Sequence, residues 1–397
     1  MEQAGVTLPS PHWRIYSLQL ALGTFAVGTD AFVIAGVLPS IASTLQVSTA
    51  SAGQLVTVFS LAYAIAAPIL GTLTSGWSRR SALVVALSVF ALGNAITAVA
   101  PNFALVLLSR VVAAAGAGLF TATASATAAA FAGPKNRGGA IARVMLGLTS
   151  SLILGAPLGT AISNWFDWRM TMWLVTALGI LAGAVILARL PDFREAGGSS
   201  FAERLSPLRN HRVLIDLLRT LLVFTGAYIP YTYISVVYAP LTHAQPQVLG
   251  MLLLVFGVAG TAGNLLAGRL SDRLGPLPVI IGGSLGLAAI LLLVPLLRAS
   301  LPLAILAVAL SGVFSFSLTT PQQHQLISHA PNGKLSLLTS LYQSVLYLAI
   351  SLSGALGAAV MKWGAAGQLT AIATLPVLFA TLITWLQSRA QAKPASA

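Results

Sequence analysis

The chain has 397 residues, of which 57% are hydrophobic and only 7% are charged, whereas about 25% of the residues of an ordinary soluble domain are charged. So few charges exclude a soluble globular protein of this length. The net charge of +13 does not indicate nucleic-acid binding, because the basic residues are scattered through short loops and form no patch. Since the chain contains no cysteine, disulfides and thiolate chemistry are excluded as well.

Twelve apolar runs follow one another along the chain. Each is long enough to cross a bilayer as a helix, which takes about 20 residues, and none shows the alternation of a barrel strand. The sequence therefore predicts an all-α polytopic membrane protein with twelve transmembrane helices. The predicted spans cover residues 16–38, 51–73, 81–99, 103–131, 143–163, 171–190, 213–238, 247–268, 277–297, 302–326, 337–361 and 368–388.

The longest interruption separates the sixth span from the seventh and divides the chain almost evenly. We expect an N-terminal six-helix bundle over residues 1–190, a cytoplasmic linker over residues 191–212 and a C-terminal six-helix bundle over residues 213–397.

The two halves also repeat each other. The segment from Gly71 to Ser75 aligns with the segment from Gly268 to Asp272 at an offset of 197, and Leu158-Gly159 aligns with Leu356-Gly357 at an offset of 198. Nearly equal offsets at two distant places predict two pseudo-symmetric bundles. Such repeats are typical of transporters, whose substrate site lies near the midplane between the halves.

The distribution of Lys and Arg predicts the orientation in the membrane. With a cytoplasmic N-terminus, 17 of the 21 basic residues fall in cytoplasmic loops and tails, three fall outside, and Arg110 lies within a span. Cytoplasmic loops of membrane proteins carry the excess of Lys and Arg. We therefore expect both termini to be cytoplasmic.

Asp30 is the only one of the eight acidic residues that lies well within a predicted span. An ionised Asp at a helix centre costs roughly 2.5–3.5 kcal/mol on insertion scales, so we expect Asp30 to carry a proton, with a structural, hydrogen-bonded Asp as the alternative. Asp30 lies eight residues from the outer end of its span at Leu38, and Arg110 lies seven residues from that of its own span at Phe103. At 1.5 Å per residue both lie about 11–12 Å deep, and we hypothesise that they pair.

Three further patterns have simpler interpretations. Asp216 precedes Arg219 by three residues at the start of the seventh span, which indicates a helix-end ion pair. His324 is expected to form interfacial hydrogen bonds near the end of the tenth span. The segment Gly282–Gly286 matches the G-x-S-x-G nucleophile motif, but it lies in an apolar span with no acid at comparable depth. We therefore expect no enzyme activity, no metal and no cofactor, with the proton as coupling ion.

The loop that follows the second span, and its repeat, carry a recognisable motif. The second copy holds Gly268, Leu270, Asp272, Arg273 and Gly275. This copy resembles the G-x-L-x-D-R-x-G-R motif of the major facilitator superfamily, and the resemblance covers nearly the whole chain.

The first copy of the loop motif is incomplete. It keeps Gly71, Leu73, Arg79 and Arg80, but Ser75 stands in place of the motif's Asp, and Ser78 stands in place of its second Gly. The resemblance implies gating loops at Gly71, Arg79, Arg80, Gly268, Asp272 and Arg273. Because the first loop lacks the acidic residue, we expect its gating interaction to be the weaker of the two. The alternative role for these loops is that of positively charged topology anchors.

Two spans carry further motifs of that family. Leu107-Leu-Ser-Arg110, followed by Gly116 and Gly118, is similar to its proton-coupling motif, which implies a coupling role for Arg110 together with Asp30. Gly155, Pro157 and Gly159 in the fifth span are similar to the exporter motif of drug:proton antiporters. Simple helix packing is the alternative for this motif, since small residues four apart let helices approach closely.

Three segments narrow the resemblance to bacterial arabinose-efflux and chloramphenicol-resistance permeases: Gly28–Pro39, Ala52–Val56 and Tyr231–Ile234. This resemblance implies a monomeric, proton-coupled antiporter in the bacterial cytoplasmic (inner) membrane that exports small amphipathic molecules, such as chloramphenicol-type antibiotics, by alternating access. Its partners are then the small-molecule substrate, protons and the bilayer, without nucleic acid. The alternatives are an exporter of sugars, nucleosides or other metabolites, and a passive facilitator. Candidate cavity residues are Phe32, Gln54, Tyr228, Tyr231, Tyr233 and Gln343.

Overall fold

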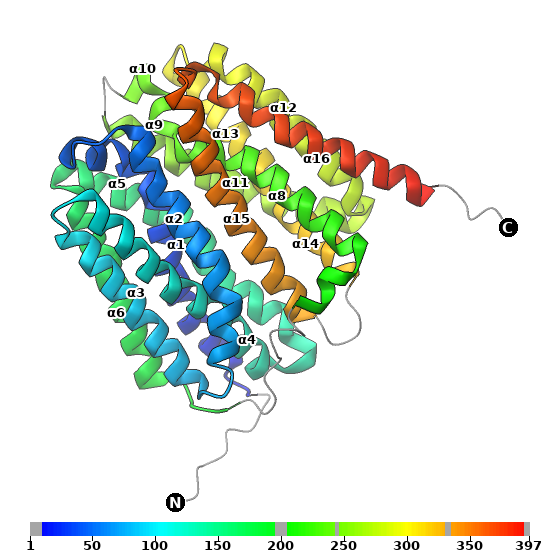
Figure 1. Cartoon of the computed structure of the whole chain (residues 1–397). Helices are drawn as coiled ribbons and strands as arrows, with labels where there is room; N and C mark the ends of the chain where they lie inside the picture. The colour runs from blue at the N-terminus through cyan, green and yellow to red at the C-terminus, as the bar shows by residue number, and fades with distance from the viewer. Residues whose placement is uncertain (1–9, 195–204, 243–245, 330–334, 393–397) are drawn as a thin grey trace, which may run out of the picture. The chain divides into compact units, whose positions relative to one another are not determined.

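The computed structural model describes residues 10–194, 205–242, 246–329 and 335–392 (Figure 1). Within these residues every regular element is helical, and twelve helices are long and apolar enough to cross a membrane. The predicted all-α fold with twelve spans is therefore confirmed. The chain forms two compact units, an N-terminal unit (Met1–Val47 and Val58–Arg204) and a C-terminal unit (Ser48–Thr57 and Leu205–Ala397). The predicted domain boundaries at residues 190 and 213 stay a prediction.

The N-terminal unit is built around α1, which packs against α4, α5 and α6, while α3 packs against α4 and α6. Gly133, at φ 69° and ψ 177°, interrupts α4 between the fourth and fifth spans, and this left-handed φ favours glycine. The elements are α1 (Trp13–Thr44), α2 (Thr49–Leu73), α3 (Arg79–Val99), α4 (Phe103–Ser150), the π-helical turn η1 (Ser151–Gly155), α5 (Ala156–Trp165) and α6 (Trp168–Arg189).

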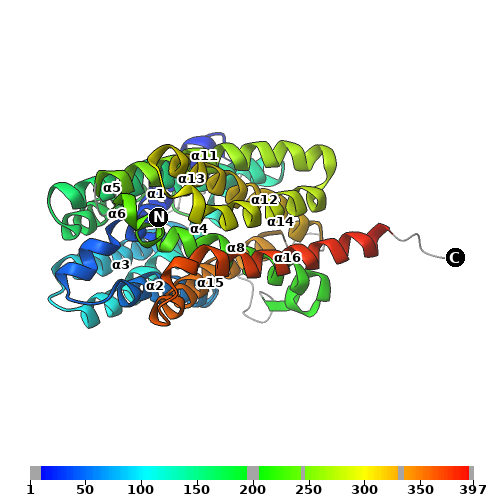
Figure 2. The same cartoon turned by 90° about the horizontal axis from the view of Figure 1, so that it is seen from above.

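In the C-terminal unit α8 packs against α15 and α16, and α11 packs against α13; Figure 2 shows α11 and α13 side by side. The elements are η2 (Ser206–Arg209), α8 (His211–Thr232), α9 (Ile234–Val237), α10 (Ala239–Thr242), α11 (Pro246–Leu274), α12 (Pro276–Leu297), α13 (Leu301–Ser317), α14 (Thr319–Ser328), α15 (Leu335–Lys362), η3 (Ala366–Gln368) and α16 (Leu369–Ala392).

Several spans differ from their predicted bounds by a few residues, and three of the differences have a local feature beside them. The fifth span begins at Lys135 instead of residue 143, and the added residues 135–139 are helical and exposed. The seventh ends at Thr232 instead of residue 238, two residues after Pro230, which has no backbone N–H to donate. The tenth is divided between α13 and α14, where the ring of Pro321 disfavours a regular turn.

The segment predicted as a linker, residues 191–212, is described only in part, and its residues 195–204 lie outside the described chain. Its first residues bind the start of α3: the Arg79 N–H donates to the Phe193 carbonyl at 2.9 Å, and the Arg80 N–H donates to Asp192 Oδ1 at 3.2 Å. On its C-terminal side the segment overlaps the start of α8 at His211.

A buried ionic cluster ties three helices of the C-terminal unit together. Arg219 NH2 lies 3.1 Å from Asp216 Oδ1 on α8, and both side chains are inaccessible to solvent. On α16, Gln387 accepts a hydrogen bond from Arg219 at 2.9 Å and donates one to Asp216 at 3.3 Å. The Nδ1 atom of His329, just after α14, lies 3.0 Å from Asp216 Oδ2.

The predicted helix-end ion pair between Asp216 and Arg219 is present. It is fully buried, so the fold encloses a second acid besides Asp30. The histidine in the cluster is His329, whereas His324 is exposed and its predicted interfacial hydrogen bonding stays a prediction. Sequence position placed Asp216 near a span end, but only packing against α14 and α16 determines its burial.

We predict that Arg219→Met lowers the free energy of unfolding by about 3–5 kcal/mol, since removing one partner leaves the other charge buried without its counter-ion. The double variant Asp216→Asn/Arg219→Met should lose less than the single variant. Arg212→Met, an exposed position on the same helix, serves as the control in unfolding measurements in detergent. Equal stability of Arg219→Met and wild type would contradict the structural role of the cluster.

Candidate functional site

Asp30 lies near the middle of α1, a helix that is buried on most of its faces. A helix of this kind offers no solvated face to a polar side chain. The Asp30 side chain is inaccessible to solvent, so its charge must be balanced by neighbouring helices. The structure supplies its partners from α3 and α4.

The counter-charge comes from Arg110 on α4. Its NH1 atom lies 2.6 Å from Asp30 Oδ1, and only 1% of the Arg110 side chain is exposed. A charge-assisted hydrogen bond of this length is among the stronger polar contacts in proteins. The structure therefore brings together the two residues that depth along the spans places at the same level.

Asn94 on α3 joins the pair as a bridge. Its Nδ2 donates to Asp30 Oδ2 at 3.3 Å and to the Phe90 carbonyl at 3.1 Å, and its Oδ1 accepts from Arg110 NH1 at 3.4 Å. Each carboxylate oxygen of Asp30 thus has its own donor. The Asn94 amide orients the Asp30 carboxylate and the Arg110 guanidinium together, because its NH2 group donates hydrogen bonds and its oxygen accepts one.

The guanidinium of Arg110 is also held from α2. Its Cζ lies 4.2 Å from the centre of the Phe59 ring, within the range in which a cation is attracted to an aromatic face. The Nε atom of Arg110 is buried and makes no hydrogen bond to any residue that the structure describes. Phe59 therefore supplies an attraction for the cation that does not depend on the charge of Asp30.

This arrangement is suited to reversible protonation of Asp30. With Asp30 ionised, the site is a neutral ion pair. With Asp30 protonated, the site carries one net positive charge, which Asn94 and the face of Phe59 still stabilise. In both charge states Asn94 lies beside the Asp30 carboxyl and beside the Arg110 guanidinium, and such continued polar contact is what a reversible proton carrier requires.

The predicted exporter motif packs directly against α1. A side chain at Gly155 would overlap Thr29, and one at Gly159 would overlap Val33. These contacts lie on either side of Asp30 and permit the close approach that small residues allow in membranes. These glycines therefore do pack closely against α1, as the helix-packing alternative expects. The exporter role of Gly155, Pro157 and Gly159 stays a prediction.

A π-helical turn precedes this contact. The N–H of Ala156 donates to the carbonyl of Ser151, five residues earlier. Pro157 follows immediately, and since a proline cannot donate a backbone hydrogen bond, the regular ladder is interrupted there. Such turns occur frequently at functional sites, and this one lies where the chain passes α1.

The two loops predicted to gate differ in backbone conformation. Gly275 precedes α12 with φ 81°, whereas Ser78, at the matching position before α3, has φ −64° and caps the helix through its side chain. The second loop therefore depends on glycine and the first does not. Asp272 and Arg273 are exposed, and Arg79 and Arg80 are half-buried beside the segment that follows α6.

The six predicted cavity residues do not form one described pocket. Phe32 is buried in the N-terminal unit, and Gln54 and Gln343 are half-buried. Tyr233 is fully buried and donates to the Gly354 carbonyl at 2.6 Å, so it joins helices. The ring centres of Tyr228 and Tyr231 lie 6.0 Å apart, with the rings edge to face.

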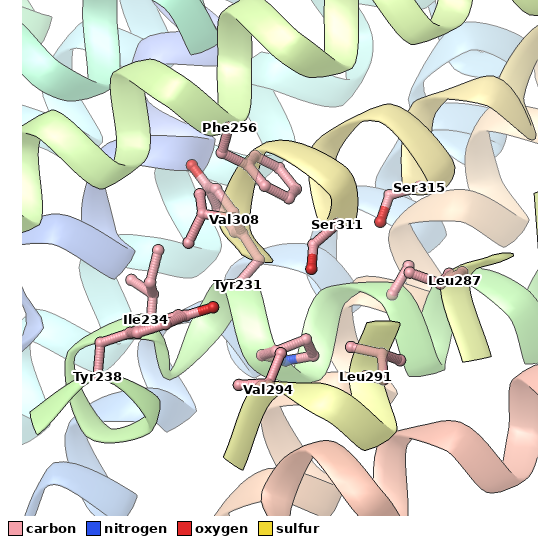
Figure 3. Close-up of a pocket in the computed structure, with 12 residues that line it drawn as sticks. Tyr231, Ile234, Tyr238, Phe256, Leu287, Leu291, Val294, Val308, Ser311 and Ser315 are labelled. Atoms are coloured by element: carbon pink, nitrogen blue, oxygen red, sulfur yellow. The ribbon is translucent and has the colours of Figure 1, made fainter. Parts of the chain in front are cut away.

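Of these six residues, only Tyr231 lines the pocket that the structure describes in the C-terminal unit (Figure 3). Helices α8, α11, α12 and α13 enclose this pocket. The substrate role of all six residues stays a prediction.

Sequence reasoning missed Asn94 and Phe59. Asn94 carried a usable signal, since it is an amide within an otherwise apolar span and must find partners there. Phe59 carried none, because an aromatic residue in an apolar helix is usually a packing residue.

Comparison with known proteins agrees with this architecture. The model of the Major Facilitator Superfamily matches residues 20–354 and 220–397. "Inner membrane transport protein YdhP" of Escherichia coli (strain K12) is 32% identical over 342 residues, which cover 86% of each chain. "Chloramphenicol resistance protein" of Streptomyces lividans is 32% identical over 304 residues, 75% of this chain and 77% of that protein.

A solved structure extends the likeness to the whole fold. The crystal structure of a D-xylose-proton symporter shares only 18% of its sequence, yet it covers 95% of this chain and 98% of its own with a TM-score of 0.79. The family resemblance inferred from the loop motifs and from Arg110 is therefore confirmed. This chain is a multi-pass membrane protein and a secondary transporter, not an enzyme, and it belongs to the Major Facilitator Superfamily.

Proposed function

We propose that the protein is a proton-coupled antiporter that exports small amphipathic molecules from the cytoplasm. The observation that carries this proposal is the buried ion pair of Asp30 and Arg110, 2.6 Å apart. A passive facilitator has no need of an enclosed acid, and such residues in membrane proteins commonly mark ion or proton pathways.

In the proposed cycle a proton binds Asp30 from the outer side and leaves toward the cytoplasm. Protonation replaces the ion pair by a singly charged site, which weakens the attraction between α1 and α4. Because the glycines of the fifth span press against α1 beside Asp30, a shift of α1 is transmitted to that span. Substrate and proton then bias the same two-state equilibrium in opposite senses.

Two parts of this proposal rest on similarity to other proteins: that the direction of transport is export, and that the substrate is an antibiotic. The Streptomyces lividans relative is named for chloramphenicol resistance, and the motif around Pro157 is similar to that of exporters. We infer a location in the bacterial cytoplasmic membrane, because the Escherichia coli relative is named an inner membrane transport protein. Sugars, nucleosides and other metabolites stay alternative substrates, which a transport panel separates.

We predict that Asp30→Asn abolishes uphill export driven by a pH gradient, lowering it at least tenfold, because the amide keeps the shape of the acid but cannot exchange a proton. The measurement uses the purified chain in proteoliposomes with an imposed pH gradient and a panel of chloramphenicol, a pentose and a nucleoside.

The matched control for this variant is Asp167→Asn, a partly exposed acid beside Arg169, which should transport like wild type. Counterflow in the absence of a gradient should survive in Asp30→Asn, since exchange needs no net proton movement. Uphill export undiminished in Asp30→Asn would overturn the proton-carrier role and favour a facilitator or another coupling ion.

We also predict that Asp272→Asn reduces transport more than Ser75→Ala does. The second loop keeps the acidic residue and the glycine of positive φ, whereas the first has serine at both positions. Initial rates of transport compare the two variants. A greater loss at Ser75 would show that the complete loop motif is not the one on which gating depends.

The orientation is tested with single cysteines, which label cleanly because the chain has none of its own. Gly138 and Gly367 are both exposed, and a side chain at either meets only open space. We expect Gly138→Cys to react with an impermeant maleimide only from the cytoplasm and Gly367→Cys only from outside. The opposite pattern would reverse the proposed topology.

A further inference from the structure

Two arginines lie against one tryptophan at the beginning of α1. The Cζ atom of Arg143, in the fifth span (Lys135–Trp165), lies 4.7 Å from the centre of the Trp13 ring, and the Cζ atom of Arg14 lies 5.6 Å from it. Both distances are within the range in which a cation is attracted to an aromatic face. Because like charges repel, this pair concentrates positive charge that a neighbouring anion would stabilise.

No acidic side chain balances this charge within the described part of the chain. The salt bridges between described residues involve neither Arg14 nor Arg143. The one hydrogen bond that the described residues show for the two guanidinium groups runs from Arg143 NH1 to the Gly139 carbonyl at 3.2 Å. Arg14 is also the second residue of α1, whose first turn holds no acid, so the positive end of the helix dipole adds to the charge.

Another arginine that stacks on a tryptophan shows the contrast. Arg169 lies over the Trp168 ring at 4.6 Å, but its NH1 donates to the carbonyls of Ala98 and Ala100, and Asp167 lies 3.8 Å from its Nε. Its charge is therefore balanced by groups of the chain itself. Among the described residues, a ring shared by two arginines without an acid occurs at Trp13 alone.

The helix surfaces that follow these arginines face lipid. Leu18 and Leu22 of α1 are 54% and 45% exposed, and they follow Arg14 at intervals of four residues, so they lie on the same face of the helix. Leu146, three residues after Arg143, is 55% exposed. Positive charge at the ends of two spans thus leads into exposed apolar surface, in the order in which a phospholipid presents its headgroup and its acyl chains.

We infer that Trp13, Arg14 and Arg143 bind the phosphate-bearing headgroup of an anionic phospholipid, whose acyl chains lie along the exposed leucines of α1 and the fifth span. Guanidinium groups bind phosphate oxygens through charge-assisted hydrogen bonds, and basic residues beside a span attract anionic headgroups. Indole rings are enriched at the same level of the bilayer. Because the three side chains come from two helices, the bound headgroup bridges α1 and the fifth span.

The alternative is that these arginines only anchor the topology, as basic residues in loops do. The site differs from such anchors because its side chains are held in place. The Gly139 carbonyl binds Arg143, and a Cβ atom at Gly139 would lie 3.8 Å from Trp13 Cη2, so the ring packs beside the backbone of the fifth span. Side chains that are already ordered lose less entropy when they bind a partner.

The test measures lipid binding to the purified, delipidated full chain by native mass spectrometry, with phosphatidylglycerol and phosphatidylcholine of equal chain length as probes. We expect wild type to bind phosphatidylglycerol more tightly than phosphatidylcholine. Each basic residue near an anionic headgroup contributes about a fivefold gain in affinity, so binding of phosphatidylglycerol should weaken about 5-fold in Arg14→Ala and about 30-fold in Arg14→Ala/Arg143→Ala.

The matched control is Arg209→Ala/Arg212→Ala, which removes two charges from exposed positions where no described ring is stacked and should bind phosphatidylglycerol like wild type. Arg14→Lys/Arg143→Lys keeps the charge but loses the planar stacking group, so it should bind more weakly than wild type. These measurements involve no transport, so their outcome is independent of the proposed proton cycle.

Three results would overturn the inference. The first is equal affinity of wild type for the two lipids. The second is a loss in Arg209→Ala/Arg212→Ala as large as that in Arg14→Ala/Arg143→Ala, or wild-type affinity in the lysine variant, because either would reduce the effect to general positive charge. The third is displacement of phosphatidylglycerol by an equal concentration of glycerol phosphate, which would indicate a site for a soluble anion in place of a lipid.

Discussion

The cost of enclosing a charge away from water governs both units of this transporter. A buried carboxylate persists only with a counter-charge and with hydrogen bonds to its remaining oxygen. Asp30 meets this condition through Arg110 and Asn94, which come from two other helices. The positions of α1, α3 and α4 are therefore linked through a few atoms, and any change in the charge of Asp30 changes how these helices hold together.

Each unit encloses a buried ion pair, at a different position along its helix. In the N-terminal unit the ion pair lies near the middle of α1, and in the C-terminal unit Asp216 and Arg219 lie near the beginning of α8. The middle of the C-terminal unit holds the apolar pocket instead. The repeated fold thus encloses one ion pair in each unit, at a different position along the helix that carries the acid.

Close helix packing connects the charged centre to the rest of the N-terminal unit. Gly155 and Gly159 let the fifth span approach α1 on both sides of Asp30, and the π-helical turn before Pro157 shifts the register of that span. In a bilayer, where apolar surface gains little by leaving lipid, such small-residue contacts are a main source of helix association. The same residues therefore serve packing and bring the fifth span next to the acid.

Hydropathy and motif spacing in the sequence determined the twelve spans, the repeat and the family, and they singled out Asp30 and Arg110 as intramembrane charges, because these follow from period, length and the cost of a charge in lipid. Helix rotation is not encoded in span depth. Only the tertiary structure showed that Asp30 and Arg110 point at each other, that Asn94 and Phe59 complete their site, and that Asp216 is buried. Those features depend on which faces of separate helices meet, and long-range packing alone decides that.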